Sequence, residues 1–295
     1  MEMVTRLNQL LTIVIPVKNE EINLPGCLEN VKSFEHVVIV DSGSVDRTLD
    51  IAQQFDREVV QFKWDGKFPK KRNWFLRNYT FKTPWCLFLD ADERITEKWI
   101  CEAEKTLVEA LDSSIDAFIC YYDNWFMGRV LRHGDAMRKT AILRIGAGEY
   151  ERIEENAWSK LDMEIHEHLV VKGEVGKIMA RMEHYDKRSL ESHWKKHEQY
   201  AAWECNRYFA LLDQKGSIST LTQLTKRQKI KYGLIKRWFF PWLYFCVSYF
   251  CKCGFLDGWA GLRFALLKVK YFSFVRDKIS KSKLDHFSSC NMRNE

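Results

Sequence analysis

The first 120 residues alternate between short apolar runs rich in β-branched residues and longer segments in which apolar residues recur at helical spacing. The short runs predict buried strands over residues 11–17, 36–40, 58–62, 85–89 and 117–122. Helices are expected between them, over residues 20–33, 44–55, 69–79 and 96–111. Strands that alternate with helices predict an α/β fold, with a mostly parallel sheet and helices on both of its faces.

The pattern loosens after about residue 122. Two further strands are expected at residues 141–145 and 169–171, followed by a long helix over residues 190–212. We therefore expect one α/β domain over residues 1–212, with halves of about 1–122 and 123–212, and a C-terminal helical region over residues 213–295. Apolar residues make up 46% of the 295-residue chain, which allows a hydrophobic core and excludes a disordered chain.

Charge also separates the two ends of the chain. Residues 1–180 contain 24 Lys and Arg and 30 Asp and Glu, a net charge of −6. Residues 181–295 contain 22 Lys and Arg and 10 Asp and Glu, a net charge of +12. An acidic first part and a basic tail indicate two different tasks.

Acidic and amide side chains follow three of the predicted strands at the point where each strand ends. Asn19 and Glu20 follow the first strand, Asp41 ends the second, and Asp90 and Asp92 follow the fourth. Ligands of mostly parallel sheets bind outside the carboxyl ends of the strands. We therefore expect these side chains to converge on one edge of the sheet.

The strongest local motif is the sequence Asp90-Ala-Asp92-Glu93, directly after an apolar strand. Two carboxylates at this spacing can bind a hard divalent cation and a neighbouring hydroxyl. A Mg²⁺ or Mn²⁺ ion held there offsets the charge of a diphosphate leaving group. The alternative is an acidic loop before a helix, where the helix dipole favours negative charge. Because this spacing is common, the motif alone favours the acidic loop.

Three further motifs have both a structural and a ligand-binding interpretation. Residues 41–46 (DSGSVD) are typical of a strand–turn–helix connection, and the first carboxylate can also accept a hydrogen bond from a nucleobase. Asn19 and Glu20 can cap a helix. Residues 70–73 (KKRN) form either a solvated basic face or contacts to phosphate and ribose.

Together and in this order, the motifs PVKNEE, DSGSVDRT, KKRN and DADE closely resemble glycosyltransferase family 2, which has the GT-A fold. The resemblance is specific over residues 11–110 and extends more weakly to about residue 210. It implies that residues 1–122 hold a nucleotide sugar and that residues 123–212 face the acceptor. It also implies a nucleoside pocket lined by Pro16, Asn19 and Glu20.

The same resemblance implies roles for the remaining motif residues. Asp41 would bind the nucleobase, and Lys71 and Asn73 would lie beside the nucleotide. Asp90 would approach the ribose, and Asp92 together with Asp90 would hold the divalent cation, Mg²⁺ or Mn²⁺, at the diphosphate.

The family's inverting mechanism also needs a base that deprotonates the acceptor hydroxyl. Residues 162–169 (DMEIHEHL) resemble a motif of the branch that includes lipopolysaccharide-core glucosyltransferases and exopolysaccharide transferases. This resemblance implies Glu167 as the base, with His166 beside it, while Asp162 and Glu164 remain alternatives. The histidines His166 and His168 could instead pair on one face of a strand.

Three residues are candidates for the acceptor side of the site. Trp125 and Phe126 can stack on a sugar, and His184 can approach the diphosphate or the metal. The alternatives are core aromatic residues and a structural histidine.

The basic tail is also aromatic. Residues 238–250 are almost wholly apolar, but the run is shorter than the about 20 apolar residues that a spanning helix needs. We expect residues 229–280 to lie on an anionic membrane surface, the alternative being a helical hairpin whose apolar run forms a core. Nucleic acid is not an expected partner, because no known nucleic-acid-binding motif occurs.

Two observations concern location. The nine cysteines are scattered without paired spacing, which is typical of reduced thiols in the cytoplasm. The first ten residues lack the basic and apolar regions of a secretory signal. With the basic tail, these features predict a peripheral protein on the cytoplasmic face of the cytoplasmic membrane.

The resemblance implies an inverting, metal-dependent transfer of a hexose, with glucose expected, from a UDP-sugar to a lipid-linked saccharide in lipopolysaccharide or surface polysaccharide biosynthesis. Transfer to a polyprenyl phosphate, as in dolichyl-phosphate-type members of the same fold, is a second possibility. A non-catalytic scaffold that binds nucleotide sugars is a third, although a scaffold does not need this set of acids.

Overall fold

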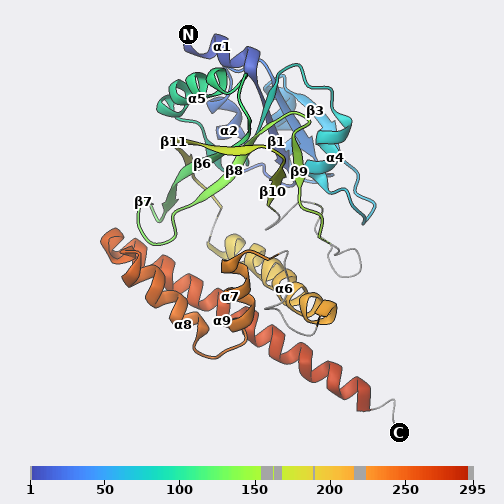
Figure 1. Ribbon diagram of the computed structural model, residues 1–295, viewed down its shortest axis with the longest axis vertical. Coiled ribbons are helices and arrows are strands. Elements are labelled where there is room, and N and C mark those ends of the chain that lie inside the picture. Colours follow the sequence, from blue (N-terminus) through green and yellow to red (C-terminus); the bar gives the residue numbers. More distant parts are fainter. Residues whose placement is uncertain (1, 154–161, 163–167, 189, 216–223, 292–295) are drawn as a thin grey trace. The chain divides into compact units, whose positions relative to one another are not determined.

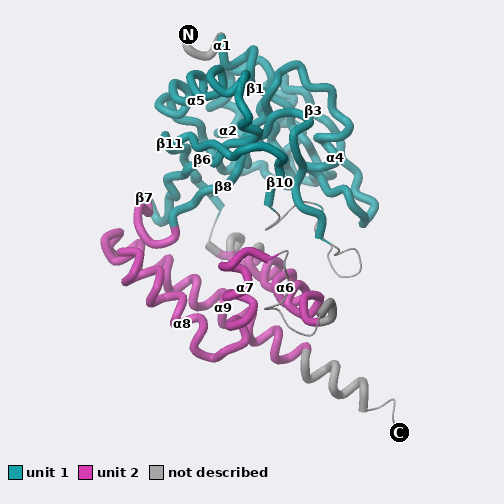
Figure 2. The backbone as a smooth tube through the Cα atoms, in the orientation of Figure 1, with its two compact units in different colours: residues 1–130, 136–188 teal, residues 131–135, 189–295 magenta. Residues whose placement is uncertain are grey.

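The protein is described by a computed structural model over residues 2–153, 162, 168–188, 190–215 and 224–291. The chain divides into two compact units (Figure 2). Unit 1 consists of Met1–Val130 and Ala136–Arg188, and unit 2 of Leu131–Asp135 and Ser189–Glu295. This division falls before the long helix α6 (Leu190–Lys215), whereas the boundary expected from the sequence follows residue 212.

Within the described residues, the main sheet has nine strands in the order β3-β2-β1-β4-β8-β6-β11-β5, with β7 paired to β6. Figure 1 labels β1, β3, β6, β7, β8 and β11 of this sheet. Four neighbouring strands are mutually parallel: β1 (Leu11–Val17), β2 (Val37–Asp41), β3 (Glu58–Gln61) and β4 (Trp85–Phe88). Strand β6 (Ile115–Phe126) is parallel to β11 (Glu174–His184). Strand β8 (Arg138–Arg144) runs antiparallel between β4 and β6.

Four short strands complete the described sheet structure. Strand β5 (Glu93–Arg94) runs antiparallel to the end of β11, and β7 (Arg129–Leu131) pairs with β6. Strands β9 (Gly148–Tyr150) and β10 (Leu169–Val171) form a separate antiparallel pair. The sheet is therefore mostly parallel, as expected, with antiparallel additions around β8.

Helices pack on both faces of the main sheet, as the sequence predicts. Strands β1, β2 and β4 are buried along their whole length, which explains their continuous apolar sequences. One core cluster joins the sheet to helices α1 (Glu2–Leu10), α2 (Leu24–Asn30), α3 (Thr48–Gln54) and α5 (Glu97–Glu109). A second cluster lies around Phe75 of α4 (Lys71–Asn78).

The sequence-based expectation lacks helix α1, strand β11 and the short strands β5, β7 and β9. Helix α1 precedes the first strand, and β11 lies next to the edge strand β5. Lys, Arg, Glu and Gly interrupt the apolar positions of β11, and only Ile178 and Met182 are buried there. A strand with so few buried positions has a weak period-two pattern, so its sequence did not identify it.

The acidic loop before a helix, the alternative interpretation of residues 90–93, is wrong in one respect. Glu93 lies in strand β5, and helix α5 begins only at Glu97. The cap of α5 is Thr96, whose side chain accepts a hydrogen bond from the backbone N–H of Trp99. The helix dipole falls off within the first turn, so it does not account for Asp92 or Glu93.

Unit 2 is helical. Helix α6 is followed by α7 (Lys226–Leu234), α8 (Phe240–Phe245), a π-helical turn (Cys246–Cys251), a 3₁₀ turn (Gly254–Asp257) and α9 (Gly258–Asn291). Its core is formed by residues of α6, α7, α8 and α9, which include Tyr208, Tyr232, Phe240 and Phe272. Among the described residues, no helix is both long and apolar enough to cross a membrane.

The short segment Leu131–Asp135 belongs to unit 2 and makes polar contacts with other residues of that unit. Asp257 accepts hydrogen bonds from the backbone N–H groups of Arg132 and His133, at 3.1 and 2.9 Å. The carboxylate of Asp135 accepts hydrogen bonds from Tyr244 and from Lys252. The chain therefore passes from unit 1 into unit 2 and back before it enters α6.

Candidate active site

The loops after β1 and β2 are joined through Asn19. Its backbone has a φ of 56°, in the left-handed region that Asn tolerates better than most residues. Its Oδ1 accepts a hydrogen bond from the backbone N–H of Val45 at 2.8 Å, and its own N–H donates to Ser44 Oγ at 2.9 Å. Pro16 is buried in β1, opposite Val40 in the parallel register. These contacts define one corner of the carboxyl edge of the sheet.

Asp41 is fully buried at the end of β2 and closes the turn that follows it. Its Oδ2 accepts a hydrogen bond from the N–H of Gly43 at 3.0 Å, and the N–H of Ser44 lies 3.2 Å from both carboxylate oxygens. Gly43 has a φ of 75°, which glycine adopts without strain. The structural interpretation of this motif is thus present in the fold, and contact with a nucleobase stays a prediction.

Lys71 and Asn73 are both buried at the start of α4. Lys71 Nζ donates a hydrogen bond to the carbonyl oxygen of Val17 at 2.8 Å, and burial lowers the pKa of this amine to about 8. The amide of Asn73 bonds both the carbonyl oxygen and the N–H of Tyr150, at 2.9 and 2.8 Å. The interpretation of this segment as a solvated basic face is therefore wrong for these two residues.

The carboxylate of Asp90 lies between two cations. Arg72 Nη2 contacts Oδ1 at 2.9 Å, and Lys139 Nζ contacts Oδ2 at 2.8 Å. Lys139 also lies 2.7 Å from the fully buried Glu93, whose Oε2 accepts a hydrogen bond from the Asp90 N–H. Burial raises the pKa of the Glu93 carboxyl to about 7, and Lys139 opposes this shift.

Asp92 lies beside a histidine and an arginine. His184, the last residue of β11, places Nε2 3.6 Å from Asp92 Oδ2. Its Nδ1 lies 3.0 Å from Asn124 Oδ1, which orients the ring. Burial lowers the pKa of His184, but the hydrogen bond and charge of Asp92 outweigh burial and raise it overall. Arg188 Nη2 lies 3.4 Å from the same Asp92 oxygen.

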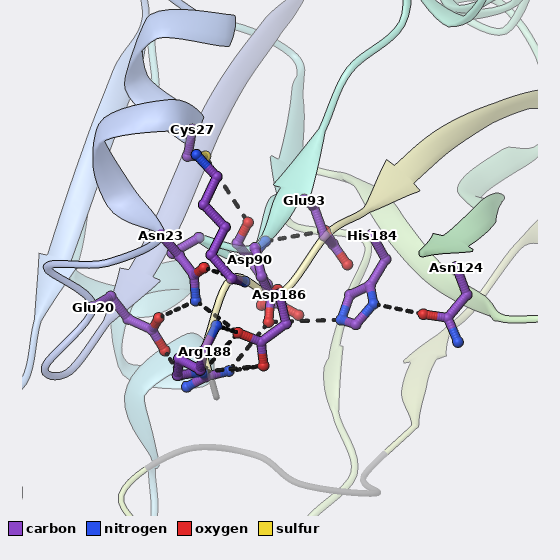
Figure 3. A network of polar contacts seen from close by, with 12 residues as sticks. Glu20, Asn23, Cys27, Asp90, Glu93, Asn124, His184, Asp186 and Arg188 are labelled. Carbon is purple, nitrogen blue, oxygen red and sulfur yellow. Dashed lines mark hydrogen bonds and ion pairs between the residues drawn. The ribbon is translucent and has the colours of Figure 1, made fainter. Parts of the chain in front are cut away.

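Arg188 also connects this group to the loop after β1. Its Nη1 lies 3.2 Å from Glu20 Oε1, and Asp186 binds its Nε and Nη2 at 2.8 Å each (Figure 3). Asn23 is fully buried and donates hydrogen bonds to Glu20 at 3.1 Å and to Asp186 at 3.2 Å. The structure thus brings Asp90, Asp92 and Glu20, three of the residues expected to converge, into one polar network with His184 (Figure 3).

The candidate acceptor residues Trp125 and Phe126 end strand β6. Both are partly buried, and the ring of Trp125 packs edge-to-face against Tyr185, with ring centroids 5.9 Å apart. Tyr185 in turn donates its backbone N–H to the carbonyl oxygen of Asp92 at 2.7 Å. The aromatic pair is therefore connected to the acidic motif, while sugar stacking stays a prediction.

The predicted base lies outside the described residues. This holds for Glu167, for His166 beside it and for the alternative Glu164. The other alternative, Asp162, is described: its carbonyl oxygen accepts a hydrogen bond from the Lys71 N–H at 3.0 Å. Its carboxylate lies 3.5 Å from Lys18 Nζ.

Sequence comparison identifies the family to which the chain belongs. Residues 12–160, about half of the chain, match the family described as Glycosyl transferase family 2. The chain belongs to glycosyltransferase family 2. The family assignment and the GT-A-like fold expected from the motifs are thereby confirmed.

Individual relatives of this family 2 glycosyltransferase are more distant. It is 27% identical over 172 residues to the lipopolysaccharide core biosynthesis glycosyltransferase LpsC of Rhizobium meliloti, covering 54% of this chain and 56% of that protein. It is 30% identical over 99 residues to an uncharacterized glycosyltransferase of Rickettsia bellii, covering 33% of each. The chain therefore spans about half of the length of LpsC and about a third of the length of the Rickettsia bellii protein.

Among solved structures, S. aureus TarS residues 1–349 are 16% identical, with a TM-score of 0.41 and 92% of each chain covered. Likeness at this level assigns no ligand to the glycosyltransferase.

The side chains of the glycosyltransferase fit a divalent cation at Asp92. A carboxylate and an imidazole nitrogen converge there, and both are accepted ligands of Mn²⁺. Asp90 fits less well, because each of its oxygens already contacts a cationic side chain. Within the described part of the chain, no group of three or more His, Cys, Asp or Glu residues is arranged to hold a metal. A cation would therefore need further ligands from the donor or from water.

Several members of the network were not predicted from the sequence, among them Asn23, Lys139, Asp186 and Arg188. Lys139 lies on an inserted antiparallel strand, and Asp186 and Arg188 follow the strand β11 that was not identified. No local motif marks these residues. Only a correct prediction of β11 and its place beside β5 could have indicated the last two.

Proposed function

We propose that this glycosyltransferase is an inverting, metal-dependent hexosyltransferase that uses a nucleotide sugar, with UDP-glucose the expected donor, and a lipid-linked saccharide acceptor. The observation that supports it most is the convergence of Asp92 and His184 beside Asp90, at the carboxyl edge of the sheet. Membership of family 2 supports the reaction class. The printed name of the Rhizobium relative is consistent with lipopolysaccharide as the destination of the sugar.

The proposed chemistry divides between donor and acceptor. A divalent cation held by Asp92 and His184 supplies charge neutralisation at the diphosphate. The acceptor hydroxyl oxygen forms a bond to the anomeric carbon while the bond from that carbon to the diphosphate oxygen breaks. Glu167 accepts the hydroxyl proton, and the electron pair of the broken bond leaves with the nucleoside diphosphate.

Asp90 has a different task in this proposal. Arg72 and Lys139 hold both of its oxygens, so its carboxylate keeps one orientation. A carboxylate fixed in this way can accept a hydrogen bond from a ribose hydroxyl without first losing conformational freedom. This separates the two acids of the motif, one for the ribose and one for the metal.

We propose that unit 2 binds the surface of an anionic membrane on the cytoplasmic side. Large aromatic side chains are exposed there, including Trp238 (75%), Trp259 (58%) and Trp242 (54%). Exposed basic residues, such as Lys236 and Arg237, adjoin them, and Arg263 stacks over Trp259 at 4.4 Å. Aromatic side chains beside cations are the composition that favours the interface of an anionic bilayer.

The decisive experiment is a transfer assay with purified full-length protein. UDP-glucose and other nucleotide sugars are supplied with Mn²⁺ or Mg²⁺, and the acceptors are lipid-linked saccharides and a polyprenyl phosphate. Product with inverted anomeric configuration on a saccharide acceptor is the expected result. Transfer only to polyprenyl phosphate would replace the acceptor class, and a retained configuration would refute the mechanism.

A further inference from the structure

Arg188 connects two segments of the chain. The family resemblance implies that these segments bind different parts of the donor. Glu20, on the nucleoside side, lies 3.2 Å from its Nη1, and Asp92, on the metal side, lies 3.4 Å from its Nη2. In a nucleotide sugar, the diphosphate joins the nucleoside to the sugar. A guanidinium between these two carboxylates therefore lies where we expect the diphosphate of a donor to pass.

A second pair of residues, Asp186 and Asn23, holds the guanidinium in place. Asp186 accepts hydrogen bonds from Nε and Nη2 at 2.8 Å, which is shorter than either contact to Glu20 or Asp92. Asn23 donates to Asp186 at 3.2 Å and accepts from the Lys187 N–H at 3.0 Å. Ligand binding can thus break the two longer contacts while the shorter ones keep Arg188 in place.

We propose that Arg188 binds the diphosphate of the donor, and that Asp186 and Asn23 are positioning residues that orient it. This inference rests on the proposed use of a nucleotide-sugar donor. Phosphate oxygens replace the carboxylates of Glu20 and Asp92 as acceptors from the guanidinium, whose planar set of N–H donors matches phosphate geometry. As the bond to the anomeric carbon breaks, Arg188 stabilises the negative charge that develops on the diphosphate oxygen.

The test is isothermal titration calorimetry of the full chain with Mn²⁺ present. The affinities for UDP, GDP, ADP and dTDP are compared first. The nucleoside that corresponds to the diphosphate with the highest affinity is then titrated in the same way. Arg188→Gln removes the charge, Arg188→Lys keeps it without the planar fork, and Asp186→Asn removes the positioning carboxylate. Lys187→Gln is the matched control, because its exposed side chain loses the same charge one residue away.

We expect Arg188→Gln to weaken binding of the nucleoside diphosphate about tenfold or more, and Arg188→Lys to weaken it less. Binding of the nucleoside and binding by Lys187→Gln should stay within about twofold of the wild type. Asp186→Asn should weaken diphosphate binding in the wild type but add little in an Arg188→Gln background, because it acts through Arg188. Melting temperatures measured without ligand identify any variant that fails to fold. The double variant, Arg188→Gln with Asp186→Asn, removes the guanidinium without leaving the charge of Asp186 unpaired.

If the wild-type protein binds a nucleoside diphosphate, the proposed donor class is supported, and two results would still overturn the inference about Arg188. One is unchanged diphosphate affinity in both folded Arg188 variants. The other is tighter Mn²⁺ binding by Arg188→Gln without weaker diphosphate binding, which would make Arg188 a competitor of the metal. Wild-type protein that binds none of the four nucleoside diphosphates would refute the proposed function and this inference together.

Discussion

Lys139 and Asp90 form an ion pair of 2.8 Å that joins strand β8 to the loop after β4. The same amine lies 2.7 Å from Glu93, so one cation serves two carboxylates. Burial disfavours the charge of Lys139, but Asp90 and Glu93 outweigh burial and raise its pKa. The acidic motif therefore depends on a residue that no local pattern connects to it.

Replacing Lys139 with Met should destabilise the fold by about 3 kcal/mol, because it leaves the buried Glu93 without its cation. Chemical denaturation monitored by circular dichroism measures the change. Lys177→Met, at an exposed position of β11, is the control and should change stability by less than about 0.5 kcal/mol. Equal stability of the Lys139 variant and the wild type would show that the ion pair contributes nothing.

The two acids of the motif should differ in their effect on metal binding. Asp92→Asn and His184→Gln should each weaken Mn²⁺ binding about tenfold or more in the presence of UDP, since the first removes a charged ligand and both disturb the convergent pair. Asp90→Asn should weaken it much less, because its oxygens face Arg72 and Lys139. Calorimetric titration with Mn²⁺ measures all three. An Asp90 variant as impaired as the Asp92 variant would make Asp90 a metal ligand as well.

The choice of base can be tested although Glu167 lies outside the described residues. Glu167→Gln should lower the transfer rate about 100-fold or more while donor binding persists, as expected for loss of a general base. Asp162→Asn, whose carboxylate pairs with Lys18, should transfer sugar at close to the wild-type rate. Single-turnover kinetics separate chemistry from binding. The opposite pattern would move the base to Asp162.

Membrane binding should depend on the exposed tryptophans of unit 2. Changing Trp238, Trp242 and Trp259 together to Ser should reduce co-sedimentation with phosphatidylglycerol vesicles about tenfold or more, because their apolar surface no longer enters the interface. The control changes the exposed Ile22, Val45 and Met127 of unit 1 to Ser. If both triple variants sediment like the wild type, these tryptophans are not the anchor.

Lys71 should give the protein a specific pH dependence. Burial lowers its pKa in the folded state to about 8, below the ordinary value of 10.5, so between these values the unfolded chain binds more protons. The free energy of unfolding therefore gains a contribution that rises with pH through this window. Melting temperatures of the wild type minus those of Lys71→Met should rise from pH 7.5 to pH 10. A constant difference would show that the amine titrates alike in both states.

Several elements were predictable because their signals are local. Strand β1 was predicted at its observed bounds, and α5 lies within the residues 96–111 expected for a helix. Helices α2 and α3 were predicted too long, since the loops that precede them carry cap-like residues without being helical. Strand β11 was missed, and with it the position of His184 at a strand end.

The sequence by itself determined the parallel core and the family, because buried strands need continuous apolar runs and the acidic motifs follow them directly. Only the tertiary structure decided which cation accompanies which carboxylate. Lys139 lies 49 residues after Asp90, and Arg188 lies 96 residues after Asp92. Such contacts depend on the order of strands, with β8 placed beside β4 and β11 beside β5, and no local period of the sequence encodes that order.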